Sequence, residues 1–118
     1  MKTAKKIVET LLEDELFEMA NFQPKSTGLR QMVWFSGDPL TKHQRPRGKV
    51  RVNNRFYPFS LDEPIQWLAA VPPGVSARDF SRIAEFVRLN RATLLAYWNG
   101  EIDTMGLVRR IQKLGEGS

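Results

Sequence analysis

The chain has 118 residues, of which 42% are hydrophobic and 26% charged, and its formal net charge is +5. This is the size and composition of one globular domain, and the excess of lysine and arginine favours acidic partners. The absence of cysteine and the single histidine exclude disulfides, thiolate metal sites, cysteine nucleophiles and any site built on a pair of imidazoles. No apolar run approaches the ~18 residues of a membrane span, and acids interrupt the N-terminal segment, so we expect a cytoplasmic protein with no signal peptide and no membrane partner.

An amphipathic helix is expected over residues 3–20. Apolar residues such as Ile7 and Leu11 recur there at three- and four-residue spacing. Its lysines come early and its acids late, which opposes the helix dipole. This helix must therefore gain stability by packing its apolar face, either on its own domain or on a second chain. A proline and a glycine then indicate a connector over 21–29.

A first strand is predicted over residues 30–36, which are rich in bulky and β-favouring side chains. Glycines and prolines make 37–48 a loop. Residues 49–53 then alternate strictly between polar and apolar, so Val50 and Val52 share one face of a second strand.

A tight hairpin turn is predicted at Asn53 and Asn54, because asparagine tolerates the positive φ that such turns need. The partner strand is then 55–61. Pro58 has no N–H for a ladder, so its amide position must face away from one neighbour or lie at a bulge. A fourth strand is predicted over 64–71, between two turns that contain proline.

The pattern changes to helix after residue 75. Ser76–Asp79 forms a capping-box type of start, and an apolar stripe follows at helical spacing. A bend or a new cap is expected near Asn90, and the Asn-Gly pair at 99–100 ends the helix. A last helix is predicted over 103–114, capped by its first or second residue, and the tail 115–118 is expected to be loose.

The order of strands first and helices afterwards favours the α+β class over alternating α/β. We therefore predict a single domain, 1–118, with a small antiparallel β-meander of three to four strands within 30–71. Helices from 76–114 cover one face of this meander, and the N-terminal helix is an addition to it.

A family resemblance rests on the stretch RFYPFSLDEPIQWLAAVPPGVSARDFSRIAEFVRLNRATLLAYWNG, residues 55–100. It resembles the bacterial domain-of-unknown-function family 4160, whose helices end in L-L-x-x-W as residues 94–98 do here. TGL, VWFS, His43 and PRGKV are similar to a related group of small proteobacterial proteins, which extends the resemblance to about residues 26–100. The resemblance implies a strand meander followed by helices, and an accessory role beside toxin–antitoxin systems or mobile elements. The family often carries a P-P-H-x-H element in the loop, where this chain has one histidine.

The predicted binding surface is a strip of cations in a segment that contains no acid. Its members are Lys42, Arg45, Arg47, Lys49, Arg51 and Arg55. Strand alternation puts Lys49 and Arg51 on one face, and Arg55 across the hairpin is a candidate to join them. Such a cluster can pair with the phosphates of a nucleic acid. It can equally serve to solvate the sheet and to discourage aggregation at a sheet edge. Both interpretations stay open.

Aromatic residues interleave with these cations. They are Trp34, Phe35, Phe56, Tyr57, Phe59 and Trp67. Alternation sends about half of them into the core. Trp34 and Tyr57 are expected at the surface, where an exposed ring can stack on an unpaired base.

Catalysis has little support in the sequence. His43 is a candidate general base, but the nearest acid in sequence is Asp38, and the histidine is equally explained as a loop residue bonded to solvent or backbone. No GxSxG, phosphate-loop spacing or convergent set of acids appears. We therefore expect a non-catalytic protein without cofactor or metal.

Two function classes remain beside the enzyme, which ranks last. The first is a small basic module that contacts nucleic acid through the cation strip. The second is a protein-interaction module that binds an acidic surface, or docks through its N-terminal helix as an accessory or inhibitor protein. The same helix, residues 3–20, is a candidate for pairing with a second copy in a homodimer.

Overall fold

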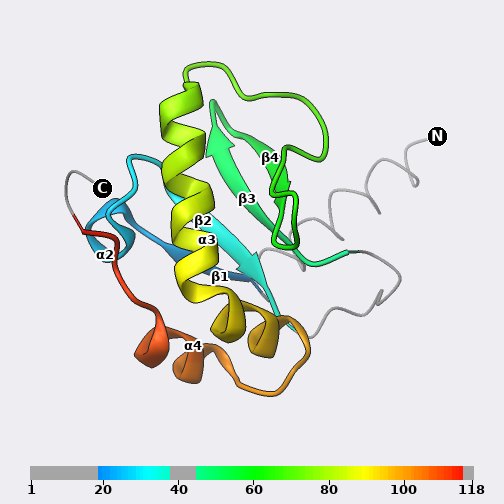
Figure 1. The fold of residues 1–118 in the computed structure, drawn as a ribbon, viewed down its shortest axis with the longest axis vertical. Helices are drawn as coiled ribbons and strands as arrows, with labels where there is room; N and C mark the ends of the chain where they lie inside the picture. Colours follow the sequence, from blue (N-terminus) through cyan, green and yellow to red (C-terminus); the bar gives the residue numbers. More distant parts are fainter. Residues whose placement is uncertain (1–18, 38–44, 116–118) are drawn as a thin grey trace.

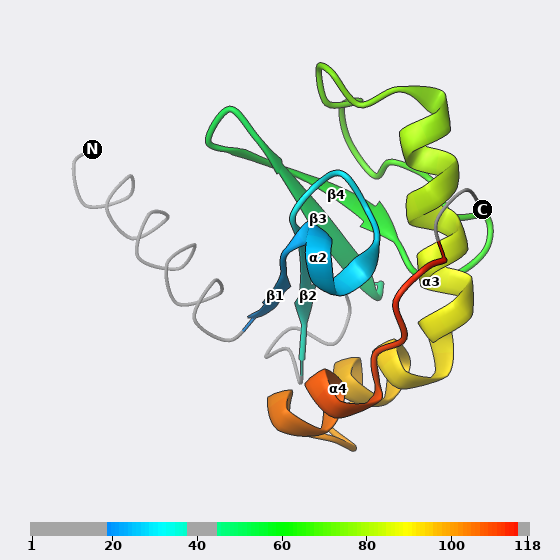
Figure 2. The same ribbon diagram turned by 90° about the vertical axis from the view of Figure 1, so that its left-hand side faces the viewer.

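The computed structural model describes residues 19–37 and 45–115. Its elements are, in chain order, β1 Met19–Phe22, α2 Pro24–Thr27, β2 Val33–Ser36, β3 Arg47–Val52, β4 Arg55–Ser60, α3 Ala77–Trp98 and α4 Thr104–Arg110. The strands form one antiparallel sheet in the order β1-β2-β3-β4, and α3 crosses one face of it (Figure 1). Figure 2 shows α3 to one side of the strands. The predicted α+β class, a meander with a helix on one face, is confirmed.

The core lies between the sheet and α3. Val33, Phe35, Val50 and Phe59 point toward the helix and are at most 1% exposed. Phe86 of α3 stacks on Phe35, with 6.1 Å between ring centroids. The face of the sheet turned away from α3 is called the outer face below, because alternate side chains of the same strands project there.

Strand β3 begins two residues earlier than predicted and takes Gly48 from the predicted loop. Gly48 lies opposite Phe35 of β2 and Phe59 of β4. A Cβ atom on this glycine would lie 2.6 Å from a ring carbon of Phe59 and 2.8 Å from one of Phe35. Glycine therefore belongs in this strand because two core rings close over it.

Strand β1 lies where the sequence indicated the end of the first helix and the start of a connector, so both boundaries were wrong. Ala20 and Phe22 are buried and Asn21 between them is exposed, which is the two-residue period of a strand paired on one side. The predicted connector also contains the single helical turn α2, which ends at Gly28 with a φ of 83°. Residues 3–18 of the predicted helix lie outside the described residues.

The hairpin between β3 and β4 was predicted correctly. Asn53 and Asn54 have φ values of 51° and 63°, the left-handed region that a type I′ turn requires at both positions. This turn sets the pairing of the two strands, so that Val50 lies opposite Tyr57.

The predicted fourth strand over 64–71 is wrong. This segment is irregular and touches the edge of β4 through one bridge, between Trp67 and Phe59. The Leu68 N–H donates to the carbonyl of Pro58 at 2.9 Å, but Pro58 has no N–H with which to return a bond. The ladder therefore stops at the proline. Because that carbonyl faces away from β3, the amide position of Pro58 does too, as predicted.

Helix α3 begins as predicted, and the axis of its last part turns away from the axis of its first part, in agreement with the bend expected near Asn90 (Figures 1 and 2). The Ser76 hydroxyl accepts from the Asp79 N–H at 3.0 Å, and the Asp79 carboxylate accepts from the Ser76 N–H at 3.1 Å. The bond from the Ser76 N–H to the Asp79 carboxylate is the largest of the causes that hold the pKa of Asp79 below its usual value. The helix then runs unbroken to Trp98, and Gly100 follows it with a φ of 74°.

Asn90 is a buried clasp and not a helix cap. Its side chain is 2% exposed, and its amide donates to the Gln112 carbonyl at 2.9 Å and accepts from the Gln112 N–H at 2.7 Å. The segment after α4 is thus held extended against α3, which is why α4 ends at Arg110 and not at the predicted residue 114. Gly115, expected in a loose tail, accepts a bond from Arg82 at 3.2 Å.

The buried position of Val50 gives a test of the sheet. Val50→Asp should lower the free energy of unfolding by several kcal/mol, because it puts a charge without a partner into the core. Val71→Asp is the matched control, since the same substitution falls on a valine that is 64% exposed. Thermal melting of both variants measures the difference, and equal melting temperatures would show that the strand register is wrong.

The clasp gives a second test. Asn90→Ala should lower the free energy of unfolding by about 1–3 kcal/mol for each backbone group of Gln112 left without a partner. Gln112→Ala is the control, because it keeps the backbone groups that Asn90 binds. Urea denaturation distinguishes them, and a Gln112→Ala protein as unstable as Asn90→Ala would contradict the clasp.

Candidate functional site

Strand β3 presents part of the predicted cation strip on the outer face. Gly48 and Val50 are buried on the helix side, so Arg47, Lys49 and Arg51 project the other way. Arg51 is exposed, and the other two cations are half-buried. These three side chains are called the outer row. The Cα atoms of consecutive members lie about 7 Å apart, because they are two residues apart along a strand.

The two arginines of the outer row have neutral hydrogen-bond partners. Arg47 Nε donates to the backbone carbonyl of Arg45 at 3.3 Å. Arg51 Nη2 donates to Asn54 Oδ1 at 2.7 Å. These bonds orient the guanidinium groups but bring no negative charge to them, so both arginines can still pair with an anion.

Arg45 belongs to the predicted strip but forms an ion pair. Its Nη2 lies 2.9 Å from Asp62 Oδ1, and its Nε donates to the same oxygen at 3.3 Å. The charge of Arg45 is thus offset by a neighbouring carboxylate. This arginine ties the start of β3 to the loop after β4.

Arg55 does not join the outer row. It lies opposite Val52, and directly paired residues of antiparallel strands project to the same face. Since Val52 is on the side of Val50, Arg55 projects to the helix side, where it is exposed at the end of the hairpin. Lys42 and His43 lie outside the described residues.

Two aromatic rings accompany the outer row. Trp34 lies opposite Lys49 in the sheet, and Phe56 lies opposite Arg51. The two rings meet edge to face, 5.4 Å between centroids at 83°. Tyr57, expected at the surface with Trp34, pairs with Val50 and so projects to the helix side. Phe56 takes its place on the outer face.

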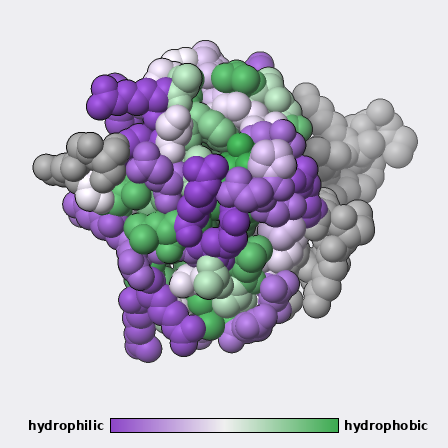
Figure 3. Space-filling model, in the orientation of Figure 1, coloured by the Kyte–Doolittle hydropathy of each residue, from purple (hydrophilic) through white to green (hydrophobic). Residues whose placement is uncertain are grey.

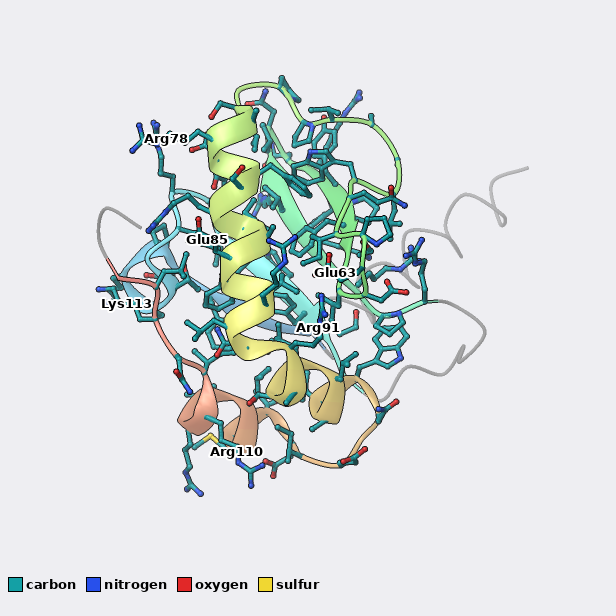
Figure 4. All side chains as sticks on the ribbon, in the orientation of Figure 1. Glu63, Arg78, Glu85, Arg91, Arg110 and Lys113 are labelled. Carbon is teal, nitrogen blue, oxygen red and sulfur yellow. The ribbon has the colours of Figure 1, made fainter. Side chains whose placement is uncertain are left out.

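The adjacent acids Asp62 and Glu63 bind arginines on two sides. Glu63 Oε2 accepts from Arg88 Nε at 2.9 Å and from Arg91 Nη2 at 2.8 Å. Figure 4 shows Glu63 and Arg91 beside each other next to α3. Hydrogen bonds from Arg88 and then Arg91 lower the pKa of Glu63 to about 2. These ion pairs connect the loop after β4 to α3, so both arginines have a structural role.

The fold brings together a second group of cations that sequence reasoning missed. This basic edge consists of Lys25, Arg30, Arg78, Arg109, Arg110 and Lys113, all of them exposed. Figure 4 shows three of its members, Arg78, Lys113 and Arg110, along one edge of the molecule. The Leu114 N–H donates to Thr27, which brings the C-terminal segment to α2. Because the six residues are scattered from α2 to the C-terminal segment, no local sequence signal marks them.

The face over α3 is mainly hydrophilic. In Figure 3 hydrophobic residues on this face are separated by hydrophilic ones across the part of the chain drawn in colour. None of helices α2 to α4 has the length and apolarity that crossing a bilayer takes. Within 19–37 and 45–115, no group of three histidine, aspartate or glutamate side chains is placed to hold a metal ion.

Comparison of the chain with family models, curated proteins and solved structures finds no match. The resemblance to family 4160 therefore stays a prediction from the sequence. The function has to be argued from the residues of the outer face and the charges around them.

The ion pairs of Glu63 predict a pH dependence. The pKa of this carboxyl is about 2 in the folded protein against an ordinary 4.5, so its contribution to stability is present above pH 4.5 and is lost as the pH falls toward 2. Glu63→Gln should therefore unfold at lower urea than the unchanged protein near neutral pH, and the gap should close in acid.

The effect should be modest, because the carboxylate is exposed to solvent. Glu101→Gln is the control, since Glu101 is exposed and has no ion pair among the described residues. Urea midpoints measured across the acid range provide the comparison. A gap for Glu63→Gln that stays constant with pH would exclude this role of the ion pairs.

Proposed function

We propose that this protein is a non-catalytic nucleic-acid-binding module that grips the phosphate backbone through Arg47, Lys49 and Arg51. The observation that carries the proposal is their common position on the outer face, beside Trp34 and Phe56. Arginines whose partners are neutral can exchange those bonds for stronger, charge-assisted bonds to phosphate. Such contacts fix the position of a nucleic acid without reading its sequence.

The charge balance of the described residues supports the same proposal. They include fourteen lysines and arginines but six aspartates and glutamates. Asp79 and Asp103 cap helices, and Asp62 and Glu63 are bound to arginines. Of the acids among the described residues, Glu85 and Glu101 have neither role. Over the whole chain the formal net charge is +5, and an excess of positive charge attracts polyanions and makes their binding sensitive to salt.

The protein-interaction alternative stays a prediction from the sequence. Docking through the first helix, and the homodimer, depend on residues 3–18, which lie outside the described residues. An acidic protein partner would use the same cations as a nucleic acid. Binding to bare DNA or RNA distinguishes the two, because an acidic protein surface does not have the dense, regular phosphates that produce a steep salt dependence.

The proposal is tested by replacing Arg47, Lys49 and Arg51 together with glutamine. Binding to DNA and RNA should weaken to a similar extent for all sequences. The slope of log K against log salt should become shallower by about 0.9 per lost phosphate contact on duplex DNA and about 0.7 on single strands. Fluorescence anisotropy over a salt series measures both quantities.

The matched control replaces Arg109, Arg110 and Lys113 with glutamine, which removes the same formal charge from the basic edge. Both triple variants should fold, because surface substitutions usually change stability by within about 0.5 kcal/mol each. If the control variant loses binding and the outer-row variant keeps it, the basic edge is the binding surface instead. An unchanged protein that binds neither DNA nor RNA at low salt would falsify the proposal.

A further inference from the structure

The outer face has an aromatic centre as well as cations. Trp34 on β2 and Phe56 on β4 reach toward each other over β3, since their strands lie on either side of it and their centroids are 5.4 Å apart. Lys49 lies opposite one ring and Arg51 opposite the other. Two adjoining rings are therefore accompanied by positive charge on the same surface.

These rings are separate from the hydrophobic core. The core cluster includes Phe35, Phe59 and Phe86, and Trp67 and Phe80 pack against it, whereas neither Trp34 nor Phe56 belongs to either group. Both residues are half-buried. Their place on the sheet is thus not explained by the need to fill the core between the sheet and α3.

The indole of Trp34 supplies a second observation. Its Nε1 is buried and makes no hydrogen bond, and among the described residues it is the one buried side-chain nitrogen or oxygen in this condition. A buried tryptophan N–H usually has an acceptor. The indole of Trp34 is therefore not held in place by a hydrogen bond from its Nε1.

From these observations we infer that the outer face binds unpaired nucleotides, with bases stacked on Trp34 and Phe56 and phosphates held by the outer row. The inference rests on the proposed function and adds its substrate class, single-stranded nucleic acid. Aromatic rings with adjacent cations are the two components that such binding needs: the rings receive the bases, and the cations follow the backbone. Because every base has a flat π-face, stacking of this kind tolerates many sequences.

A duplex cannot use the aromatic part of this surface. Its bases are already stacked and paired inside the helix, so a sheet face meets mainly phosphates and sugars. The outer row can still attract a duplex electrostatically. The difference in affinity between a single strand and a duplex thus reports on the rings, and the salt dependence reports on the cations.

The experiment compares a labelled single strand of about 12 nucleotides with the same strand annealed to its complement. The full chain should bind the single strand more tightly than the duplex at equal salt. Trp34→Leu should weaken binding to the single strand about tenfold, roughly the effect of losing one stacked base, and leave duplex binding nearly unchanged. Trp34→Phe keeps a flat ring and should retain most of the preference.

Trp67→Leu is the control, because Trp67 is also half-buried but packs against Phe59 and Phe80 and not on the outer face. Phe56→Leu is a second test of the platform if Trp34→Leu does not fold. Equal affinity of the unchanged protein for both forms, or full single-strand binding by folded Trp34→Leu and Phe56→Leu, overturns the stacking inference and leaves the proposed function standing. Absence of binding to either form ends both proposals.

Discussion

Val50 lies at the centre of the sheet, paired with Val33 on β2 and with Tyr57 on β4, and it is fully buried. The side chains of a strand alternate between its two faces, so the register of β3 decides two things together. It places Gly48 under the core rings, and it sends the three cations of the outer row away from the core. A shift of one residue would bury these cations and expose Val50. The position of the outer row is therefore a consequence of the same constraint that forms the core.

The acids of the domain determine which cations keep their charge available. Asp62 and Glu63 bind Arg45, Arg88 and Arg91 and connect the loop after β4 to β3 and α3. Each of these arginines has a structural role and is therefore a poor candidate for binding a ligand. The outer row and the basic edge lie elsewhere on the molecule. The protein thus separates the arginines that hold its loops together from the cations of the outer row and the basic edge.

Local sequence signals predicted the fold well where a residue type strongly prefers one backbone conformation or one hydrogen-bonding role. Two asparagines at 53–54 indicated a turn with positive φ, and Ser76–Asp79 indicated a helix start; both are confirmed. The errors fall where the partner is far away in sequence. For Asn90, local signals indicated a bend in the helix but not the two hydrogen bonds that its side chain makes to the backbone of Gln112. The segment 64–71 looks like a strand, but a proline in its neighbour prevents the ladder from extending.

The candidate site shows the same limit more sharply, because counting cations in the sequence does not say which of them can bind. Alternation correctly put Lys49 and Arg51 on one face. It could not show that Arg45 is paired with Asp62, 17 residues away, or that the turn places Arg55 on the opposite face. Tyr57 was also expected at the surface beside Trp34. The pairing with β3 places Phe56 on the outer face instead and Tyr57 on the helix side. A strip of six cations in the sequence becomes a row of three beside two rings. This smaller set has the arrangement that stacking and phosphate binding require on one surface.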